Sequence, residues 1–221
     1  MSIAQRDVMP LAATPVAREA DAFYHFCRWL PRTFWRLSAG LRIEGLHNVP
    51  ATGPFMLVAN HQSNLDPILI QASCPRIVAT MAKSSQFNVP LFGPWIRRLY
   101  AFPVRRYQVD PQSVRTALRL LATGRAIAIY MEGERTWDGR MLPPRAGTTR
   151  LVLKAGVPVV PCAIRGAYDA WPRWARTPQR RPVTVAFGPP LSFPRLDHRD
   201  QREIALPDTS ARLVTAIQAL L

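Results

Sequence analysis

Short apolar runs alternate with stretches of helical periodicity from Gly45 onward, and this alternation restricts the fold class more than any other feature. Near-continuous apolar runs bounded by Gly, Pro or polar residues are typical of strands buried on both faces of a sheet. The predicted strands are Phe55–Asn60, Ile77–Met81, Ala101–Val104, Ala126–Met131, Val157–Ile164 and Val183–Phe187. The predicted helices are Pro67–Ser73, Leu91–Leu99, Pro111–Thr123, Thr148–Ala155 and Ser210–Leu221. We therefore expect an α/β fold, with a mixed, largely parallel β-sheet flanked by helices.

An amphipathic helical segment is predicted over residues 21–45. At 100° per residue one face is apolar and the opposite face carries arginines. The apolar face consists of Phe23, Phe26, Cys27, Leu30, Phe34, Leu37 and Leu41, and the opposite face of Arg28, Arg32 and Arg36. This pattern is typical of a helix lying in a membrane interface, and a helix packed on the domain core fits it equally well. Pro31 is expected to kink the segment or split it into two short helices.

The remaining organisation is simple. Residues 1–20 are expected to be a flexible leader, and residues 46–221 one α/β domain, since 221 residues suffice for one sizeable domain. Residues 1–20 contain charges and lack an apolar core, so they do not resemble a secretory signal. No run of about 18 apolar residues occurs, so we expect no segment to span a membrane unaided.

The charge is strongly positive, with 29 Lys+Arg against 14 Asp+Glu and a formal net charge of +15. Such an excess indicates an anionic partner: a phospholipid surface, a nucleic acid, a phosphorylated substrate or an acidic carrier protein. The arginines are spread along the chain and no nucleic-acid-binding fold signature appears, so we expect no nucleic acid. The three cysteines, Cys27, Cys74 and Cys162, offer neither metal-ligand spacing nor a disulfide framework, and we expect no metal site.

Two polar clusters follow predicted strands, at residues 61–66 and 132–136. In open α/β sheets the functional site lies beyond the carboxyl ends of the strands. The first cluster offers His61 as a base, with Asp66 five positions further on. One tight turn or a helix start can return the Asp66 carboxylate to the imidazole, which would fix its tautomer and raise its basicity.

Four blocks in the same order resemble the 1-acyl-sn-glycerol-3-phosphate acyltransferase family. Residues 60–66 contain the family's His-x4-Asp motif as His61 and Asp66. Residues 81–106 resemble the second block, whose closing arginine falls on Arg106. Residues 130–136 read Tyr-Met-Glu-Gly-Glu-Arg-Thr where the family has Phe-Pro-Glu-Gly-Thr-Arg-Ser, and residues 157–161 resemble the fourth block. The resemblance covers about residues 50–165.

The resemblance implies a catalytic role for the first motif. His61 would take the proton from the acceptor hydroxyl as that hydroxyl attacks an acyl thioester, and Asp66 would orient and support the imidazolium. No covalent acyl-enzyme is needed, because a thioester is already activated. Backbone amides near Gly133 or Val160 would stabilise the oxyanion.

The resemblance also implies a substrate-binding set. Arg106 and Arg135 would hold the acceptor's phosphate, a task that suits the fork geometry of arginine. Glu132 and Gly133 would line the acceptor site, although Glu132 fits a role in holding its loop equally well. Lys83 is a weaker candidate for anion contact.

The implied substrates are a lysophospholipid acceptor, with 1-acyl-sn-glycerol-3-phosphate giving phosphatidic acid as the leading case, and acyl-CoA or acyl carrier protein as the donor. The donor is a substrate, and no cofactor is implied. We expect a peripheral or monotopic protein of phospholipid biosynthesis, bound to anionic lipid at the cytoplasmic face of a bacterial inner membrane.

Two residues depart from the family pattern. Met131 stands where the family has Pro, and Glu134 where it has Thr or Ser. The Glu134 carboxylate would repel an anionic headgroup unless it points away or pairs with Arg140 or Arg145. A different acceptor, such as a lyso-aminolipid, is therefore an open alternative.

Two other classes of protein remain to be weighed. One is a non-catalytic basic membrane-binding protein. The other is a serine hydrolase that uses Ser63 or Ser84, which is disfavoured because neither serine lies in a Gly-x-Ser-x-Gly elbow. The basic aromatic stretch Tyr168–Arg181 is interpreted as an exposed connection.

Overall fold

A seven-stranded sheet forms the centre of the computed structural model, which describes residues 21–108 and 110–221. The strand order is β1-β7-β6-β2-β5-β3-β4. The bounds are β1 Leu41–Glu44, β2 Met56–Ala59, β3 Val78–Lys83, β4 Phe102–Val104, β5 Ala126–Tyr130, β6 Val159–Arg165 and β7 Val183–Phe187. Every pair of neighbours is parallel except β6 and β7, so the predicted mixed, largely parallel sheet is confirmed.

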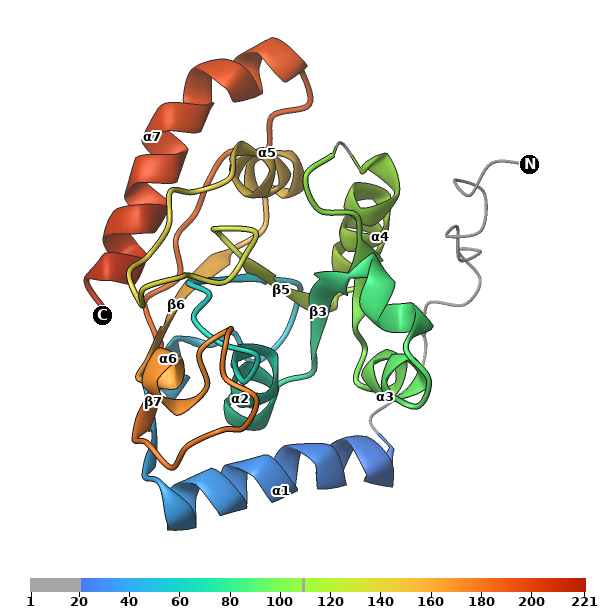
Figure 1. Ribbon diagram of the computed structural model, residues 1–221. Coiled ribbons are helices and arrows are strands. Elements are labelled where there is room, and N and C mark those ends of the chain that lie inside the picture. The colour runs from blue at the N-terminus through green and yellow to red at the C-terminus, as the bar shows by residue number, and fades with distance from the viewer. Residues whose placement is uncertain (1–20, 109) are drawn as a thin grey trace.

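Helices cover both faces of the sheet (Figure 1). One face carries α1 (Ala22–Ser38), α2 (Asp66–Ser73) and α6 (Ala167–Ala170), and the other carries α4 (Pro111–Ala122), α5 (Ala146–Ala155) and α7 (Arg199–Gln218). The remaining helix α3 (Phe92–Arg98) and the short 3-10 helices η3 (Leu46–Asn48) and η4 (Ser84–Asn88) connect strands.

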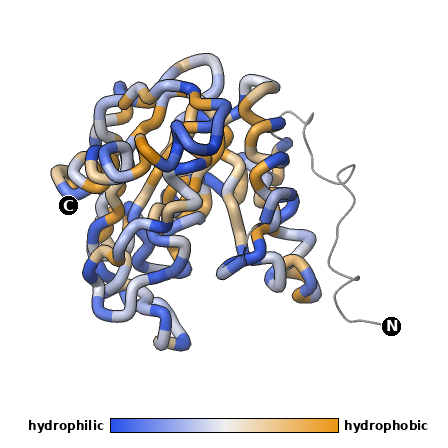
Figure 2. The backbone as a smooth tube through the Cα atoms, turned by 90° about the horizontal axis from the view of Figure 1, so that it is seen from above, coloured by the Kyte–Doolittle hydropathy of each residue, from blue (hydrophilic) through white to orange (hydrophobic). Residues whose placement is uncertain are grey.

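The core lies in two layers because side chains of a strand alternate between faces. In β2, Leu57 and Ala59 belong to the cluster under α2, whereas Met56 and Val58 belong to the cluster under α5 and α7. All four are fully buried. Figure 2 shows the apolar strands passing through the middle of the molecule. Burial on both faces explains why these strands read as continuous apolar runs in the sequence.

The N-terminal segment differs from its predicted boundaries. The predicted leader, residues 1–20, lies outside the described residues. The helix α1 begins after Asp21, whose carboxylate caps Tyr24 N–H at 2.9 Å, and it continues through Pro31 without splitting. It ends at Ser38, and Gly40 adopts φ 81 before the chain enters β1. The prediction that the helical segment extends to residue 45 is therefore wrong, since Leu41–Glu44 pair with β7 at the sheet edge.

The closing helix is also longer than predicted. The helix α7 begins at Arg199 rather than Ser210 and contains Pro207. A proline inside a helix removes one backbone hydrogen bond. The burial of Leu213 and Ile217 against the sheet stabilises the helix despite that loss.

Candidate active site

The two predicted polar clusters meet because β2 and β5 are neighbours in the middle of the sheet. Beyond the ends of the two strands, the backbones remain paired. Met131 N–H donates to the Ala59 carbonyl at 2.9 Å, and Thr136 N–H donates to the His61 carbonyl at 2.9 Å. The carboxyl ends of two central strands therefore bring residues 61–66 and 132–136 into one site.

His61 and Asp66 form a buried pair. The Nδ1 of His61 lies 2.7 Å from Asp66 Oδ2, and the two residues are 5% and 0% exposed. The same oxygen accepts the backbone N–H groups of Gln62 at 2.7 Å and Ser63 at 2.8 Å. An acceptor carboxylate fixes the imidazole proton on Nδ1, so Nε2 is left with the lone pair that a general base needs.

The environment of His61 favours the neutral imidazole. Burial lowers the pKa of His61, and the charges of Arg106 and Arg135 lower it further, while the bond and charge of Asp66 act in the opposite direction. The Tyr130 ring stacks on the imidazole, with ring centroids 3.9 Å apart and planes at 13°. A neutral, fixed imidazole at neutral pH is the protonation state that proton abstraction requires.

Two side chains hold the turn that carries the pair. Asn60 bonds in both directions to the backbone of Ile164 in β6, at 3.0 and 2.8 Å. Ser63 Oγ donates to the Trp171 carbonyl at 2.7 Å and accepts Leu65 N–H at 3.1 Å. Ser63 is fully buried and engaged at its oxygen, so it is not placed as a nucleophile.

Glu132 acts on the backbone of the site. Its carboxylate accepts His61 N–H at 2.8 Å and Leu142 N–H at 2.9 Å, and the residue is 1% exposed. Burial raises the pKa of Glu132 to about 7, against the opposing effect of these two hydrogen bonds. These contacts correspond to the loop-holding alternative of the sequence analysis.

Arg106 and Arg135 lie beside the His61–Asp66 pair, half-buried. Neither guanidinium donates to a carboxylate among residues 21–108 and 110–221. Burial lowers the pKa of both groups, and for Arg135 the neighbouring charges of Arg173 and Arg106 add to that effect. The charge of Glu134 acts on Arg106 and that of Asp66 on Arg135, but neither carboxylate lies within ion-pair distance of its arginine. Two partly desolvated guanidinium groups in this setting form a site suited to an anion.

The other predicted residues lie in different settings. Gly133 has φ 70, and a Cβ there would lie 3.0 Å from Cγ of Arg145, so the tight turn requires glycine. Its N–H already donates to the Tyr130 carbonyl at 3.2 Å, and Val160 lies inside β6. Lys83 is exposed at the end of β3, two strands from β2.

The Glu134 carboxylate is paired with an arginine, which is one of the two conditions under which it would not repel an anionic headgroup. It accepts from Arg145 Nη2 at 2.9 Å and from the Tyr107 hydroxyl at 3.1 Å. Although burial acts to raise the pKa of Glu134, the hydrogen bonds from Tyr107 and Arg145 outweigh it and lower the pKa. The partner is Arg145 and not Arg140, and the pairing offsets the repulsion that Glu134 would exert on an anion.

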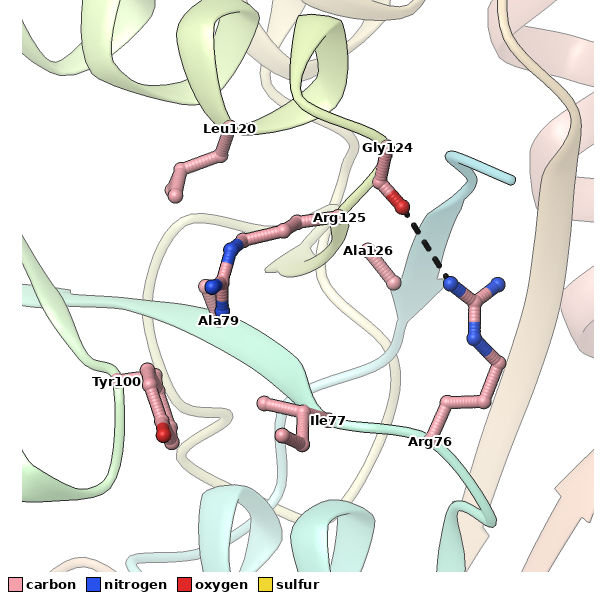
Figure 3. A pocket seen from close by; sticks show the side chains of 8 residues that line it. All are labelled: Arg76, Ile77, Ala79, Tyr100, Leu120, Gly124, Arg125 and Ala126. Carbon is pink, nitrogen blue, oxygen red and sulfur yellow. Dashed lines mark hydrogen bonds between the residues drawn. The ribbon is translucent and has the colours of Figure 1, made fainter. Parts of the chain in front are cut away.

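A separate cavity of about 240 Å³ opens at the other end of the strands, where β3 and β5 begin (Figure 3). Arg76 donates to the Gly124 carbonyl there at 3.4 Å, and Arg125, Tyr100 and Leu120 also line the cavity. The residues that line this cavity include no histidine and no carboxylate.

Comparison with known proteins identifies the family of this chain. A family model described as Acyltransferase matches residues 40–165, more than half of the chain. This chain belongs to the acyltransferase family. The resemblance seen in the sequence is thereby confirmed, and the matched region includes the His61–Asp66 pair, Arg106, Arg135 and Glu132.

Named relatives and a solved structure agree with the family. The acyltransferase is 28% identical to the 1-acyl-sn-glycerol-3-phosphate acyltransferase of Bacillus subtilis (strain 168), over 65% of this chain and 71% of the relative. It is 30% identical to the alpha form of that enzyme from Mus musculus, over 75% of this chain and 60% of the relative. The crystal structure of the 1-acyl-sn-glycerophosphate acyltransferase PlsC from Thermotoga maritima superposes with a TM-score of 0.68 at 25% identity, covering 86% of this chain and 77% of that one.

Proposed function

We propose that this acyltransferase moves an acyl chain from an acyl thioester to the free hydroxyl of 1-acyl-sn-glycerol-3-phosphate, giving phosphatidic acid. One observation carries the proposal: a buried His61–Asp66 pair at 2.7 Å lies beside two half-buried arginines that have no carboxylate partner among the described residues. A base and an anion site side by side suit an acceptor that has both a hydroxyl and a phosphate.

The proposed reaction follows from the protonation state of His61, a neutral imidazole with its proton on Nδ1. Its Nε2 takes the proton of the acceptor hydroxyl while the hydroxyl oxygen bonds to the thioester carbonyl carbon. The resulting imidazolium is stabilised by the Asp66 carboxylate. The tetrahedral intermediate then breaks its C–S bond, and the leaving thiolate takes the proton from His61. The products are the new ester and a free thiol, with the histidine neutral again.

Acyl-CoA or acyl carrier protein is proposed as the donor. Both are anionic, the first through its phosphates and the second through its acidic surface, and the formal net charge of +15 favours either partner. The donor enters as a substrate, and the proposed reaction uses no resident cofactor.

The alternative of a lyso-aminolipid acceptor rested on Glu134. Because Arg145 and Tyr107 engage that carboxylate, its charge is offset within the protein and the phosphate acceptor is favoured.

Mass spectrometry of the products tests the proposed acceptor. Purified protein is incubated with a mixture of lysolipids and with both donors, and H61A is the matched control. Addition of one acyl chain to lysophosphatidic acid by the wild type alone is the expected result. Acylation of another lysolipid in preference would overturn the acceptor, and products formed equally by H61A would overturn the mechanism.

The surface of α1 supports a second part of the proposal, attachment to a membrane. The helix docks on the domain through Tyr24, Trp35 and Arg28; the Arg28 guanidinium donates to the Gln71 and Cys74 carbonyls. This docking leaves an apolar stripe facing away from the domain. The stripe consists of Phe26 (53% exposed), Leu30 (47%), Phe34 (47%) and Leu37 (82%). Exposed apolar residues on an arginine-rich helix suit an anionic bilayer interface.

We infer that the acyltransferase is a peripheral protein of the cytoplasmic membrane face. Within residues 21–108 and 110–221, the structure has no helix that is long and apolar enough to cross a membrane. Binding to the membrane would rest on the α1 stripe and on the positive charge of the arginines. Attachment to the membrane would keep the enzyme close to its lipid acceptor.

Vesicle sedimentation tests this attachment. L37E places a charge in the α1 stripe and is expected to reduce binding to anionic vesicles about tenfold. I204E is the matched control, because Ile204 is equally exposed at 82% but lies on α7, away from α1. Equal binding of the two variants would show that the stripe does not contact lipid.

A further inference from the structure

The segment after β6 covers part of the site, although the sequence analysis treated Tyr168–Arg181 as an exposed connection. The Tyr168 hydroxyl donates to the Trp137 carbonyl at 2.8 Å, and its N–H donates to Gln62 Oε1 at 3.4 Å. The Trp171 carbonyl accepts the Ser63 hydroxyl at 2.7 Å. These contacts lie beyond residue 165, where the family match ends, and they tie the segment to both polar clusters.

Arg173 is the residue of this segment that contacts the second polar cluster. Its Nη1 donates to the Arg135 carbonyl at 3.0 Å, and its guanidinium lies 3.3 Å from the centroid of the Trp137 ring. The same Nη1 lies 3.8 Å from Glu134 Oε2. The side chain is 21% exposed. Stacking and one hydrogen bond fix the plane of the guanidinium and leave most of its five donors for a ligand.

Arg173 adds positive charge to an anion site that is already cationic. Its charge acts on both Arg135 and Arg106 and contributes to the lowered pKa of each, after the larger effect of burial. Arg145 and Arg173 both contact the carboxylate of Glu134, and the charge of that carboxylate also acts on Arg106. Like charges held at short range repel, and a ligand that carries two negative charges relieves this repulsion more than a ligand that carries one.

We propose that Arg173, held by Trp137, Glu134 and the Arg135 carbonyl, is a third guanidinium of the acceptor-headgroup site and selects a dianionic phosphomonoester over a singly charged phosphodiester. This inference rests on the proposed function, because it names the charge state of the acceptor that the site accepts. The role of Glu134 follows from it: its carboxylate lies between Arg145 and Arg173 and limits their mutual repulsion while no acceptor is bound.

Kinetics with two acceptors of the same acyl chain test the selection. The acceptors are 1-acylglycerol 3-phosphate, a phosphomonoester, and lysophosphatidylglycerol, a phosphodiester. R173A is expected to raise KM for the phosphomonoester about tenfold, the loss typical of one charge-assisted hydrogen bond, and to change KM for the phosphodiester less than threefold. The kcat and the donor KM should stay within about threefold of wild type. R173K retains the positive charge but not the forked guanidinium, and its KM for the phosphomonoester should lie between those of wild type and R173A.

R176A is the matched control, because Arg176 is an exposed arginine of the same segment. Equal KM values for R173A and R176A would overturn the proposal. An equal loss of kcat on both acceptors would also overturn it, since that result indicates a structural role in the segment. Thermal melting of each variant identifies a change in folding, and R173K serves as the test if R173A does not fold.

Calorimetric binding separates this inference from the proposed function. A short-chain, soluble 1-acylglycerol 3-phosphate is titrated into wild type, R173A and R176A without donor. If wild type acylates neither acceptor but binds this ligand, and R173A weakens binding about tenfold, the proposed reaction fails and the Arg173 site stands. Binding of unchanged strength in R173A would exclude Arg173 from the site whatever the reaction is.

Discussion

The carboxylate of Glu132 accepts the backbone N–H of His61 at 2.8 Å, so a residue just beyond the end of β5 fixes the backbone just beyond the end of β2. The second oxygen of Glu132 accepts Leu142 N–H at 2.9 Å. The glutamate thus ties the histidine loop to the start of the segment that leads to α5. The imidazole of His61 is oriented by Asp66, while its backbone is positioned by Glu132.

The ionisation of Glu132 predicts a pH-dependent stability. Burial raises its pKa from the usual 4.5 to about 7, so the folded protein binds this proton more tightly than the unfolded chain does. The contribution of this group to stability therefore decreases as pH rises from about 4.5 to about 7. Urea unfolding at a series of pH values measures it. E132Q cannot titrate, and the free energy of unfolding of wild type minus that of E132Q should fall across this range. If the free energies of unfolding of wild type and E132Q depended on pH in the same way, the raised pKa of Glu132 would be contradicted.

The hydrogen bond between Asp66 and His61 predicts a large loss in D66N. A single oxygen, Asp66 Oδ2, makes all three contacts, so an asparagine oxygen in its place still accepts the two amides and the imidazole N–H. The asparagine lacks the negative charge that stabilises the imidazolium formed during the reaction. We expect kcat to fall about 100-fold to 10,000-fold with KM little changed. D169N, at an exposed aspartate of α6, should retain wild-type turnover. A D66N enzyme within tenfold of wild type would show that turnover does not depend on the charge of Asp66.

The unpaired guanidinium of Arg135 predicts an effect on one substrate only. R135A should raise the KM of the phosphate-bearing acceptor at least tenfold and leave the donor KM unchanged. R140A is the control, because Arg140 is an exposed arginine nearby in the chain. Steady-state kinetics with each substrate varied in turn measure both constants. An increase confined to the donor KM would show that Arg135 binds the donor and not the acceptor.

The engaged hydroxyl of Ser63 predicts that no acyl-enzyme forms. Ser63 Oγ donates to the Trp171 carbonyl, and S63A should lower kcat less than about tenfold, through a less ordered turn. Intact-protein mass spectrometry after incubation with donor alone should show an unmodified chain. An added acyl mass on Ser63 would favour the covalent route of a serine hydrolase.

Most of the fold follows from local sequence patterns. The central strands are buried on both faces, and their continuous apolar runs predicted six of the seven strands. The remaining strand, β1, is a short edge strand of alternating burial that directly follows a helix, so no apolar run distinguishes it. Gly40 marked the end of α1, but the apolar Leu41 continued the helical period and concealed the boundary.

The site was predictable where its residues lie in one short motif. His61 and Asp66 are five positions apart, and a single turn joins them. Tyr130 was missed as the stacking partner of His61, because residues 69 positions apart are brought together only by the pairing of β2 with β5. Arg173 was missed for a similar reason: its contacts with Trp137 and Arg135 join segments on different elements. The clustering of tryptophan and arginine in residues 168–181 was the only local signal.

The most direct test of the account is the turnover of H61A with lysophosphatidic acid and an acyl thioester, measured as thiol release beside wild type. We predict a loss of kcat of about 1,000-fold, with the KM of the acceptor within threefold and a melting temperature close to that of wild type. A folded H61A that retains more than one tenth of wild-type turnover would contradict the assignment of His61 as the general base.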